Sequence, residues 1–122
     1  MLAGKFYTIV AQQQPAEQAV HTTIAWNADH DIFKGHFPDQ PVVPGVCMMQ
    51  TIQELLSGAS GKKLVVKKAA NMKFLNMIDP RQTPQVTVEI TYTETEEGYK
   101  ANAVIRHDAT VFLKFQGLFR QS

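Results

Sequence analysis

Three prolines lie within seven residues, at Pro38, Pro41 and Pro44. Proline fixes its own φ, has no backbone N–H, and disfavours the helical conformation in the residue before it. The segment 35–45 is therefore expected to form neither a helix nor a central strand. It predicts a stiff, extended loop that holds its two ends in a fixed relation with little loss of chain entropy.

The stretch after this loop predicts the one helix of the chain. Apolar residues recur there at spacings of three and four residues, and several of the intervening positions are apolar as well. They are Val46, Cys47, Met48, Met49, Ile52, Leu55 and Leu56. A helix that is apolar on nearly every side is mostly buried. We expect it to end near Ser57 and Gly58, because glycine suits a helix C-cap.

The remaining sequence alternates with the period of two that is typical of strands. Val20, Thr22, Ile24 and Trp26, for example, fall on one face of the segment 18–26. The expected strands are residues 5–12, 18–26, 64–74, 86–92, 99–105 and 111–119, with a break at Gln14 and Pro15 and turns at 27–31, 96–98 and 107–109. Five or six strands and one helix predict an α+β fold in which an antiparallel sheet wraps around a buried helix.

Composition limits the class of protein further. The 122 residues suffice for a single domain, 1–122, and 44% hydrophobic with 19% charged residues is typical of a globular protein. A net charge of +1 disfavours a global nucleic-acid or membrane footprint. The single Cys47 cannot form an internal disulfide, and the four histidines lack metal-ligand spacing. We expect a cytoplasmic protein with no signal peptide, no membrane span and no metal.

Residues 35–46 read Gly-His-Phe-Pro-x-x-Pro-Val-x-Pro-Gly-Val. This motif resembles the signature of the β-hydroxyacyl-acyl-carrier-protein dehydratases, a hot-dog-fold family. The flanking sequence agrees: His30-x-Ile32-Phe33-x-Gly35 precedes the motif, and Ala69-x-x-x-Lys73-Phe74, an Asp-Pro loop and Val86-Thr87-Val88 follow it. The resemblance covers nearly the whole chain and implies one hot-dog domain, with the sheet wrapped around a central helix.

The resemblance implies that His36 is the base that removes a proton from the carbon next to a thioester carbonyl. Water is then lost from a 3-hydroxyacyl thioester to leave an enoyl thioester, without a cofactor. Elementary physics fits this role, because Gly45 and Val46 at a helix N-terminus offer unsatisfied N–H groups to a carbonyl oxygen. The alternative for His36 is a loop histidine that packs against prolines. His30 is expected to hydrogen-bond within its own turn.

The sequence departs from the family at one catalytic position. The family has a carboxylate fourteen residues after the histidine and tends to have a glutamine one turn later, whereas this chain has Gln50 and then Glu54. Residues four apart share a helix face. We therefore hypothesise that Glu54 supplies the acid, directly or through a water held by Gln50, and that burial raises its pKa. The alternative is a Glu54 that faces solvent or pairs with Lys62 or Lys63.

Two further groups of residues have an expected role and a plainer alternative. An acyl chain is expected to contact Phe37, Met48, Met49 and Ile52, with Met72 and Met77 nearby, although these residues would serve equally as core. An acidic carrier protein with its phosphopantetheine is expected to dock on Lys62, Lys63, Lys67, Lys68, Lys73 and Arg81. The alternative for these cations is a solvated strand face.

The resemblance also implies a homodimer or a dimer of dimers, in which each active site takes His36 from one chain and the helix residue from the other. The favoured function is dehydration of 3-hydroxyacyl groups carried by acyl carrier protein, in fatty-acid or related biosynthesis. Two alternatives follow from Gln50. One is a thioesterase that uses Gln50 with Glu54, and the other is a partner subunit that binds acyl carrier protein and has lost catalysis.

Overall fold

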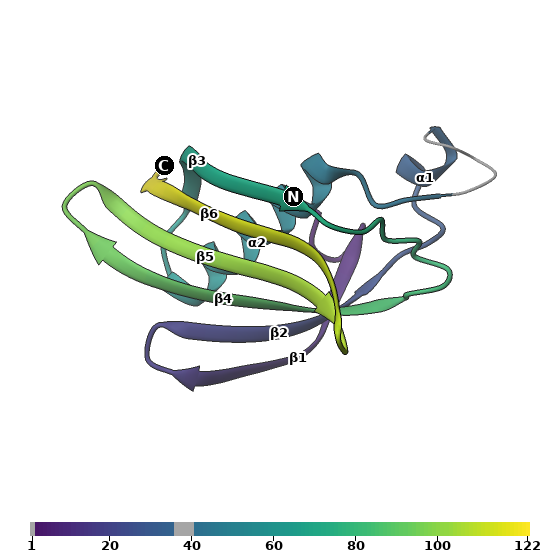
Figure 1. Cartoon of the computed structure of the whole chain (residues 1–122), viewed down its shortest axis with the longest axis horizontal. Helices are drawn as coiled ribbons and strands as arrows, with labels where there is room; N and C mark the ends of the chain where they lie inside the picture. The colour runs from purple at the N-terminus through teal and green to yellow at the C-terminus, as the bar shows by residue number, and fades with distance from the viewer. Residues whose placement is uncertain (1, 36–40) are drawn as a thin grey trace.

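In the computed structural model, which describes residues 2–35 and 41–122, an antiparallel sheet curls around one long helix (Figure 1). The elements in chain order are β1 (Tyr7–Ala16), β2 (Ala19–Trp26), α1 (Ile32–Gly35), α2 (Gly45–Ser60), β3 (Leu64–Phe74), β4 (Gln85–Thr95), β5 (Gly98–His107) and β6 (Thr110–Gln121). The described strands form a six-stranded sheet in the order β1-β2-β4-β5-β6-β3. The predicted fold class, an α+β sheet wrapped on a central helix, is confirmed.

Helix α2 is buried in the concave face of the sheet because its apolar side chains occupy almost every direction. Ile52 and Leu56 are fully buried, and so are Ile24, Val88 and Ile105 from the strands that cover the helix. Burial of a side chain of this size contributes about 1.5–3 kcal/mol. The helix and the inner face of the sheet therefore share one core.

The helix ends later than the sequence predicts. It passes through Gly58 and stops at Ser60, and the left-handed residue that ends it is Gly61, with φ 74°. The N–H of Gly61 donates to the carbonyl oxygen of Ser57 at 3.0 Å. Both glycines fit a C-cap by type, but the hydroxyl of Ser57 is bonded to the backbone of Leu64, which holds the last turn in place.

The first strand also differs from the prediction. It begins at Tyr7 and continues past Gln14 and Pro15 to Ala16, so the predicted break is wrong. Proline is tolerated there because β1 is an edge strand, and the register with β2 shifts between Gln13 and Ala16. In β2 the predicted alternation is confirmed, with Val20, Thr22, Ile24 and Trp26 buried.

Strand β3 follows α2 directly in the chain but pairs with β6, the last strand, so it lies at an edge of the sheet. Its start at Leu64 and its end at Phe74 are as predicted. Several large apolar side chains on and after this edge are exposed, namely Val66, Met72, Phe74, Leu75 and Met77, together with Val46 at the start of α2. Among the helices described, none is long and apolar enough to span a bilayer.

Gly98 in the β4–β5 turn should be intolerant of any side chain. Its φ is 136°, and a Cβ there would fall on the carbonyl oxygen of Phe119. We expect Gly98→Ala to lower the free energy of unfolding by roughly 1–3 kcal/mol, because the strained backbone and the clash act together. Urea denaturation measures this change.

Gly58 supplies the matched control, since it lies within α2 and a Cβ there meets nothing within 4 Å. Gly58→Ala should raise the free energy of unfolding by about 0.5–1 kcal/mol, the helix preference of alanine over glycine. Equal destabilisation by both substitutions would contradict the assignment of strain to Gly98.

Candidate active site

Helix α2 begins with two backbone donors that lack an acceptor among residues 2–35 and 41–122. Pro44 precedes the helix with φ −64° and ψ 146° and provides no side-chain cap. Its carbonyl oxygen accepts from Cys47 N–H at 3.0 Å and from Met48 N–H at 3.1 Å. Within the described ranges, the N–H groups of Gly45 and Val46 have no acceptor. These two donors lie at the positive end of the helix dipole, where a developing negative charge is stabilised.

An apolar hollow of about 300 Å³ adjoins these donors. Its lining residues are Val42, Val43, Pro44, Gly45, Met48, Phe74, Asn76 and Met77. The Phe74 ring lies directly against Gly45, so that a Cβ at position 45 would be 2.8 Å from its Cζ atom. Glycine is therefore required for this close approach. The hollow has the size and lining to accept a short acyl segment beside the free N–H groups.

The predicted acyl-contact residues fall into different surroundings. Met48 lines this hollow, as does Met77, whereas Ile52 is fully buried in the core and Met49 is half-buried against it. Phe37 lies outside the described residues, and so does His36, the predicted base. Phe74 was named from the sequence only as part of the family resemblance and not as a site residue, because its position at the end of a strand gave no sign that its ring reaches Gly45.

Gln50 and Glu54 do interact, as their spacing predicts. The Gln50 Nε2 atom donates to the Glu54 Oε2 atom at 2.9 Å. The same carboxylate accepts three more hydrogen bonds, from Leu2 N–H at 2.8 Å, Ala3 N–H at 2.9 Å and the Tyr7 hydroxyl at 3.0 Å. Glu54 thus ties the N-terminal segment to helix α2.

These bonds decide the protonation state of Glu54. Burial acts to raise its pKa, but the hydrogen bonds from Leu2, Gln50, Tyr7 and Ala3 outweigh it and hold the pKa below its usual value. The predicted rise in pKa is wrong, and Glu54 is ionised at neutral pH. The alternative pairing with Lys62 or Lys63 is also wrong for Glu54.

An ionised Glu54 in turn sets the orientation of Gln50. A carboxylate only accepts hydrogen bonds, so the amide N–H of Gln50 faces it. The carbonyl oxygen of Gln50 and its second N–H are left for other partners. The half-buried Gln50 can therefore orient a hydroxyl or a water, but it cannot transfer a proton.

The N-terminal segment connects Glu54 to the approach of the proline-rich loop. Phe6 is fully buried, and its ring stacks on Phe33 at 5.1 Å and meets His30 edge-on at 5.3 Å. Phe33 belongs to α1, which ends at Gly35, the residue before His36 in the sequence. Glu54 is therefore linked, through the N-terminal segment, to the short helix that precedes His36 in the sequence.

His30 has the role predicted for it. Its Nδ1 atom accepts from the N–H of Ile32 at 3.1 Å, within its own turn. The short helix α1 that follows was not predicted. The turn before α1 starts at Asn27, whose side chain accepts from the N–H of Asp29 at 3.1 Å. Asn and Asp side chains commonly form such bonds, and their presence in the sequence indicated the turn.

Comparison with known proteins identifies the family of the chain. The family described as ApeI-like, ApeI dehydratase, matches residues 12–112. The chain belongs to this dehydratase family. It is 29% identical over 97 residues to the 3-hydroxyacyl-[acyl-carrier-protein] dehydratase FabZ of Clostridium acetobutylicum, covering 73% of this chain and 67% of that protein. The FabZ of Novosphingobium aromaticivorans is 24% identical over 115 residues, covering 86% and 73%.

Solved structures confirm the hot-dog fold. The dehydratase heterocomplex ApeI:P from Xenorhabdus doucetiae superposes with a TM-score of 0.79 at 17% identity, covering 93% of this chain and 96% of that one. An uncharacterised protein from Erwinia carotovora subsp. atroseptica gives a TM-score of 0.67 at 16% identity, with 95% of each chain covered. At these identities the likeness concerns the fold.

The cations predicted to dock a carrier protein have different local surroundings, and their docking role stays a prediction. Lys62 lies 3.9 Å from Glu94 and 5.6 Å from the centre of the Tyr99 ring. Arg81 lies 3.5 Å from Asp79 in the turn after β3. Lys63, Lys67, Lys68 and Lys73 are exposed along β3 or just before it. No group of three or more potential metal ligands occurs in the part of the chain that the structure describes.

Glu54→Gln should destabilise the protein at neutral pH by roughly 1–3 kcal/mol, because four donors lose an ionised acceptor. The pKa of Glu54 is lower in the folded state than in the unfolded state. Its contribution is therefore complete above the unfolded pKa of about 4.3 and is lost as the pH falls through the folded pKa. The loss of stability in acid should be shallower in the variant.

Chemical denaturation at a series of pH values measures both effects. Glu96→Gln is the control, since Glu96 is exposed in the β4–β5 turn. A Glu54→Gln curve that parallels the parent curve down to pH 3 would show that this carboxylate does not anchor the N-terminal segment.

Proposed function

We propose that this chain dehydrates 3-hydroxyacyl thioesters carried by acyl carrier protein and leaves enoyl thioesters. The observation that carries the proposal is the pair of N–H groups of Gly45 and Val46, which have no acceptor among the described residues and lie beside an apolar hollow, in a chain of the dehydratase family. FabZ relatives act on 3-hydroxyacyl-[acyl-carrier-protein], and this supports the substrate class. The same resemblance supports His36 as the base.

The proposed reaction begins with the thioester carbonyl oxygen at the N–H groups of Gly45 and Val46. These donors stabilise the negative charge that forms on the oxygen when His36 removes the proton from the adjacent carbon. The bond from the next carbon to the hydroxyl then breaks, and the double bond forms. The hydroxyl needs a proton to leave as water.

That proton has to come from somewhere other than residue 50. Gln50 is a neutral amide, and its neighbour Glu54 is ionised because its pKa is lowered. We therefore assign both transfers to His36, which takes the proton from carbon and returns it to the leaving hydroxyl. Gln50 orients that hydroxyl with its free carbonyl oxygen or N–H. The imidazole of His36 is therefore unchanged at the end of the reaction. The electron pair of the broken C–H bond forms the double bond, and the electron pair of the C–O bond leaves with the water.

A second copy of the chain is part of the proposal. The apolar side chains of Val46, Met72, Phe74 and Met77 are exposed around the free edge of β3. An exposed apolar edge strand favours pairing with another strand. Two β3 edges that pair would cover these residues and bring the start of one α2 near its counterpart. Each site then takes His36 from one chain and Gln50 from the other.

A partner subunit without catalysis of its own is the second candidate function. The lowered pKa of Glu54 favours it, because no carboxyl group at this position of α2 holds a proton at neutral pH. The structural neighbour ApeI:P is itself a heterocomplex. In this case the chain would pair with a catalytic relative and take part in binding the acyl carrier protein.

Turnover of a 3-hydroxyacyl thioester by the purified chain tests the proposal. We expect His36→Ala to lower turnover by about 10²–10⁴-fold, the usual contribution of an acid–base group. The circular dichroism spectrum of the variant should be unchanged. Gln50→Glu should raise turnover, because it restores a carboxyl group at the position where the family has one. The reaction is followed by the absorbance of the enoyl product.

Three other outcomes identify the alternatives. An inert parent protein that Gln50→Glu activates would indicate a partner subunit. Release of free thiol from saturated acyl thioesters would indicate a thioesterase. Unchanged turnover in His36→Ala would exclude His36 as the base.

Sedimentation of the chain at micromolar concentration should show a dimer or a dimer of dimers. Phe74→Glu places a charge in the exposed apolar patch and should favour the monomer. We expect the dissociation constant of the dimer to rise about tenfold or more. Ile9→Glu is a matched control at the opposite edge, because Ile9 is exposed to a similar extent on β1. A folded monomer at micromolar concentration would contradict a composite site.

A further inference from the structure

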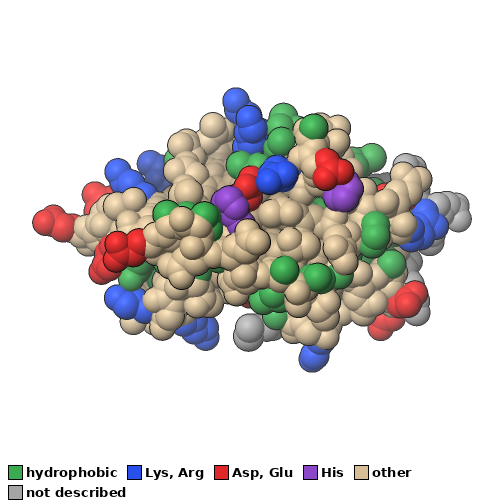
Figure 2. Space-filling view, turned by 90° about the horizontal axis from the view of Figure 1, so that it is seen from below, with side chains coloured by type: hydrophobic (Ala, Val, Ile, Leu, Met, Phe, Trp, Pro, Cys, Tyr) green, Lys and Arg blue, Asp and Glu red, His purple; other side chains and the backbone are tan. Residues whose placement is uncertain are grey.

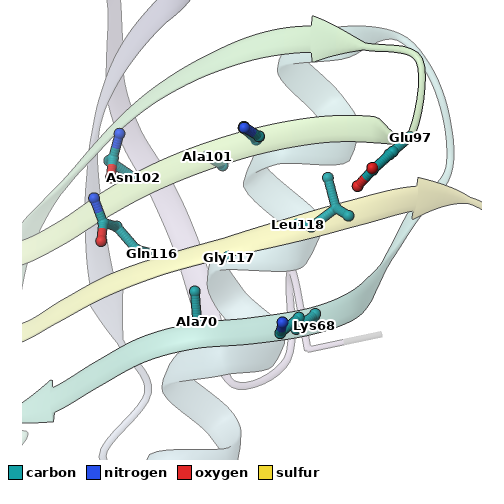
Figure 3. Close-up of a pocket in the computed structure, with 9 residues that line it drawn as sticks. Lys68, Ala70, Glu97, Ala101, Asn102, Gln116, Gly117 and Leu118 are labelled. Carbon is teal, nitrogen blue, oxygen red and sulfur yellow. The ribbon is translucent and has the colours of Figure 1, made fainter.

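The outer face of the sheet, which is turned away from α2, carries two adjoining hollows that the proposed reaction does not use. Figure 3 shows the first of them. Their volumes are about 360 Å³ and 300 Å³. Both are lined by Asn102 and Gln116, whose side chains lie next to each other on β5 and β6. Helix α2 lies behind the sheet in this view, so the sheet separates the hollows from the start of the helix.

Four lysines mark the two ends of this surface, which we call the outer groove. Lys68 on β3 and Lys100 on β5 both pair with Leu118 of β6, so they flank it from either side. Four residues away along β6, Lys73 on β3 pairs with Lys114. At about 3.3 Å per residue, the two lysine pairs are roughly 13 Å apart.

Three amides occupy the middle of the outer groove. Asn71 on β3 and Asn102 on β5 both pair with Gln116 of β6, so the amides form a row across three neighbouring strands. The order along the groove is therefore basic, amide, basic. Glu97 also lines the first hollow, at the β4–β5 turn.

The outer groove keeps a net positive charge, because its lining has four lysines and the one carboxylate of Glu97. No carboxylate of the described chain forms an ion pair with Lys68, Lys73, Lys100 or Lys114. Lys73 and Lys114 stand directly opposite each other on paired strands, an arrangement that like charges destabilise. A bound anionic group would relieve this repulsion.

Some charged side chains elsewhere on the protein form ion pairs. Arg106 bonds to Glu89 at 2.8 Å, and His21 lies 3.5 Å from the same carboxylate. Where the molecule is seen from below, acidic, basic and histidine side chains are intermixed (Figure 2). Unlike Arg106, the four lysines of the outer groove form no ion pair with a carboxylate of the described chain.

We propose that the outer groove binds an acidic helix of another protein. A helix is about 10 Å across and two of its turns span about 11 Å, so a helix lying along β6 fits the width of three strands and the spacing of the lysine pairs. Glutamates two turns apart on one face would meet Lys68 and Lys100 at one end and Lys73 and Lys114 at the other. The amides would bond to polar side chains between them.

Other occupants fit this surface less well. One phosphate group cannot contact lysine pairs that lie roughly 13 Å apart. A second copy of the chain that presented the same face would oppose lysine to lysine. A membrane surface would leave the row formed by Asn71, Gln116 and Asn102 without matching partners.

An NMR titration of the whole chain at low ionic strength tests the proposal. The probe is a helix-forming peptide with paired glutamates two turns apart on one face, and the reference is a peptide of equal composition with scattered glutamates. We expect the probe to shift the side-chain amide signals of Asn71, Asn102 and Gln116. It should bind at least about fivefold more tightly than the reference, since exposed ion pairs each contribute modestly.

Matched variants locate the site. Lys114→Gln should weaken binding of the probe about three- to tenfold. Lys5→Gln removes the same charge from an exposed lysine of the N-terminal segment and should leave binding unchanged. Because the readout is binding, the result does not depend on whether the chain dehydrates thioesters.

Several outcomes would overturn the proposal. They are equal binding of the two peptides, no binding of either, and an equal loss in Lys5→Gln. Shifts of the same amide signals with inorganic phosphate alone would indicate a small-anion site. Shifts with anionic vesicles would indicate a membrane surface, and shifts with protein concentration alone would indicate a second copy.

Discussion

One helix has to cover the apolar face of a six-stranded sheet, and the rest of the structure depends on this constraint. To fill that role α2 is apolar on nearly every side, which leaves few positions for polar residues. The half-buried polar side chains Gln50, Gln53 and Glu54 make hydrogen bonds that attach the helix to other parts of the chain. Gln53 accepts from the N–H of Val66 on β3 at 3.0 Å, and Glu54, to which Gln50 donates, holds the N-terminal segment. The helix therefore joins the core, the sheet edge and the N-terminus.

The pair Gln50 and Glu54 shows that exchanging two residue types does not exchange their chemistry. A carboxyl group one helical turn further along meets a different environment, in which two backbone N–H groups and the Tyr7 hydroxyl donate to it. These donors stabilise the ionised form more than burial destabilises it, so the pKa of Glu54 falls. Tyr7 responds in the opposite sense: burial and the nearby carboxylate raise the pKa of its hydroxyl, which stays protonated and keeps donating.

The features that could be predicted from sequence were those encoded by neighbouring residues. Alternation identified the buried face of β2, and the switch from prolines to an apolar run identified the start of α2 at Gly45. The role of Glu54 could not be predicted in this way, because its partner Leu2 is 52 residues distant and donates a backbone group that any sequence would offer. The same applies to the Phe74 ring on Gly45. The end of α2 was misplaced for a different reason: Gly58 and Gly61 are equally plausible C-cap residues by type, and the sequence alone does not distinguish them.

The pairing of β3 with β6 sets the order in which this fold can be completed. Leu64 is in register with Gln121, and the N–H of Ser122 donates to the carbonyl oxygen of Lys63 at 2.8 Å. A chain that emerges from the ribosome thus makes α2 and β3 long before the strand that pairs with β3. Until then Val66, Met72 and Phe74 are exposed beside an unpaired backbone, and closure requires contacts between distant parts of the chain, which form slowly. Folding of this domain therefore cannot be completed before β6 is made, and β3 is expected to be its most aggregation-prone segment in the interval.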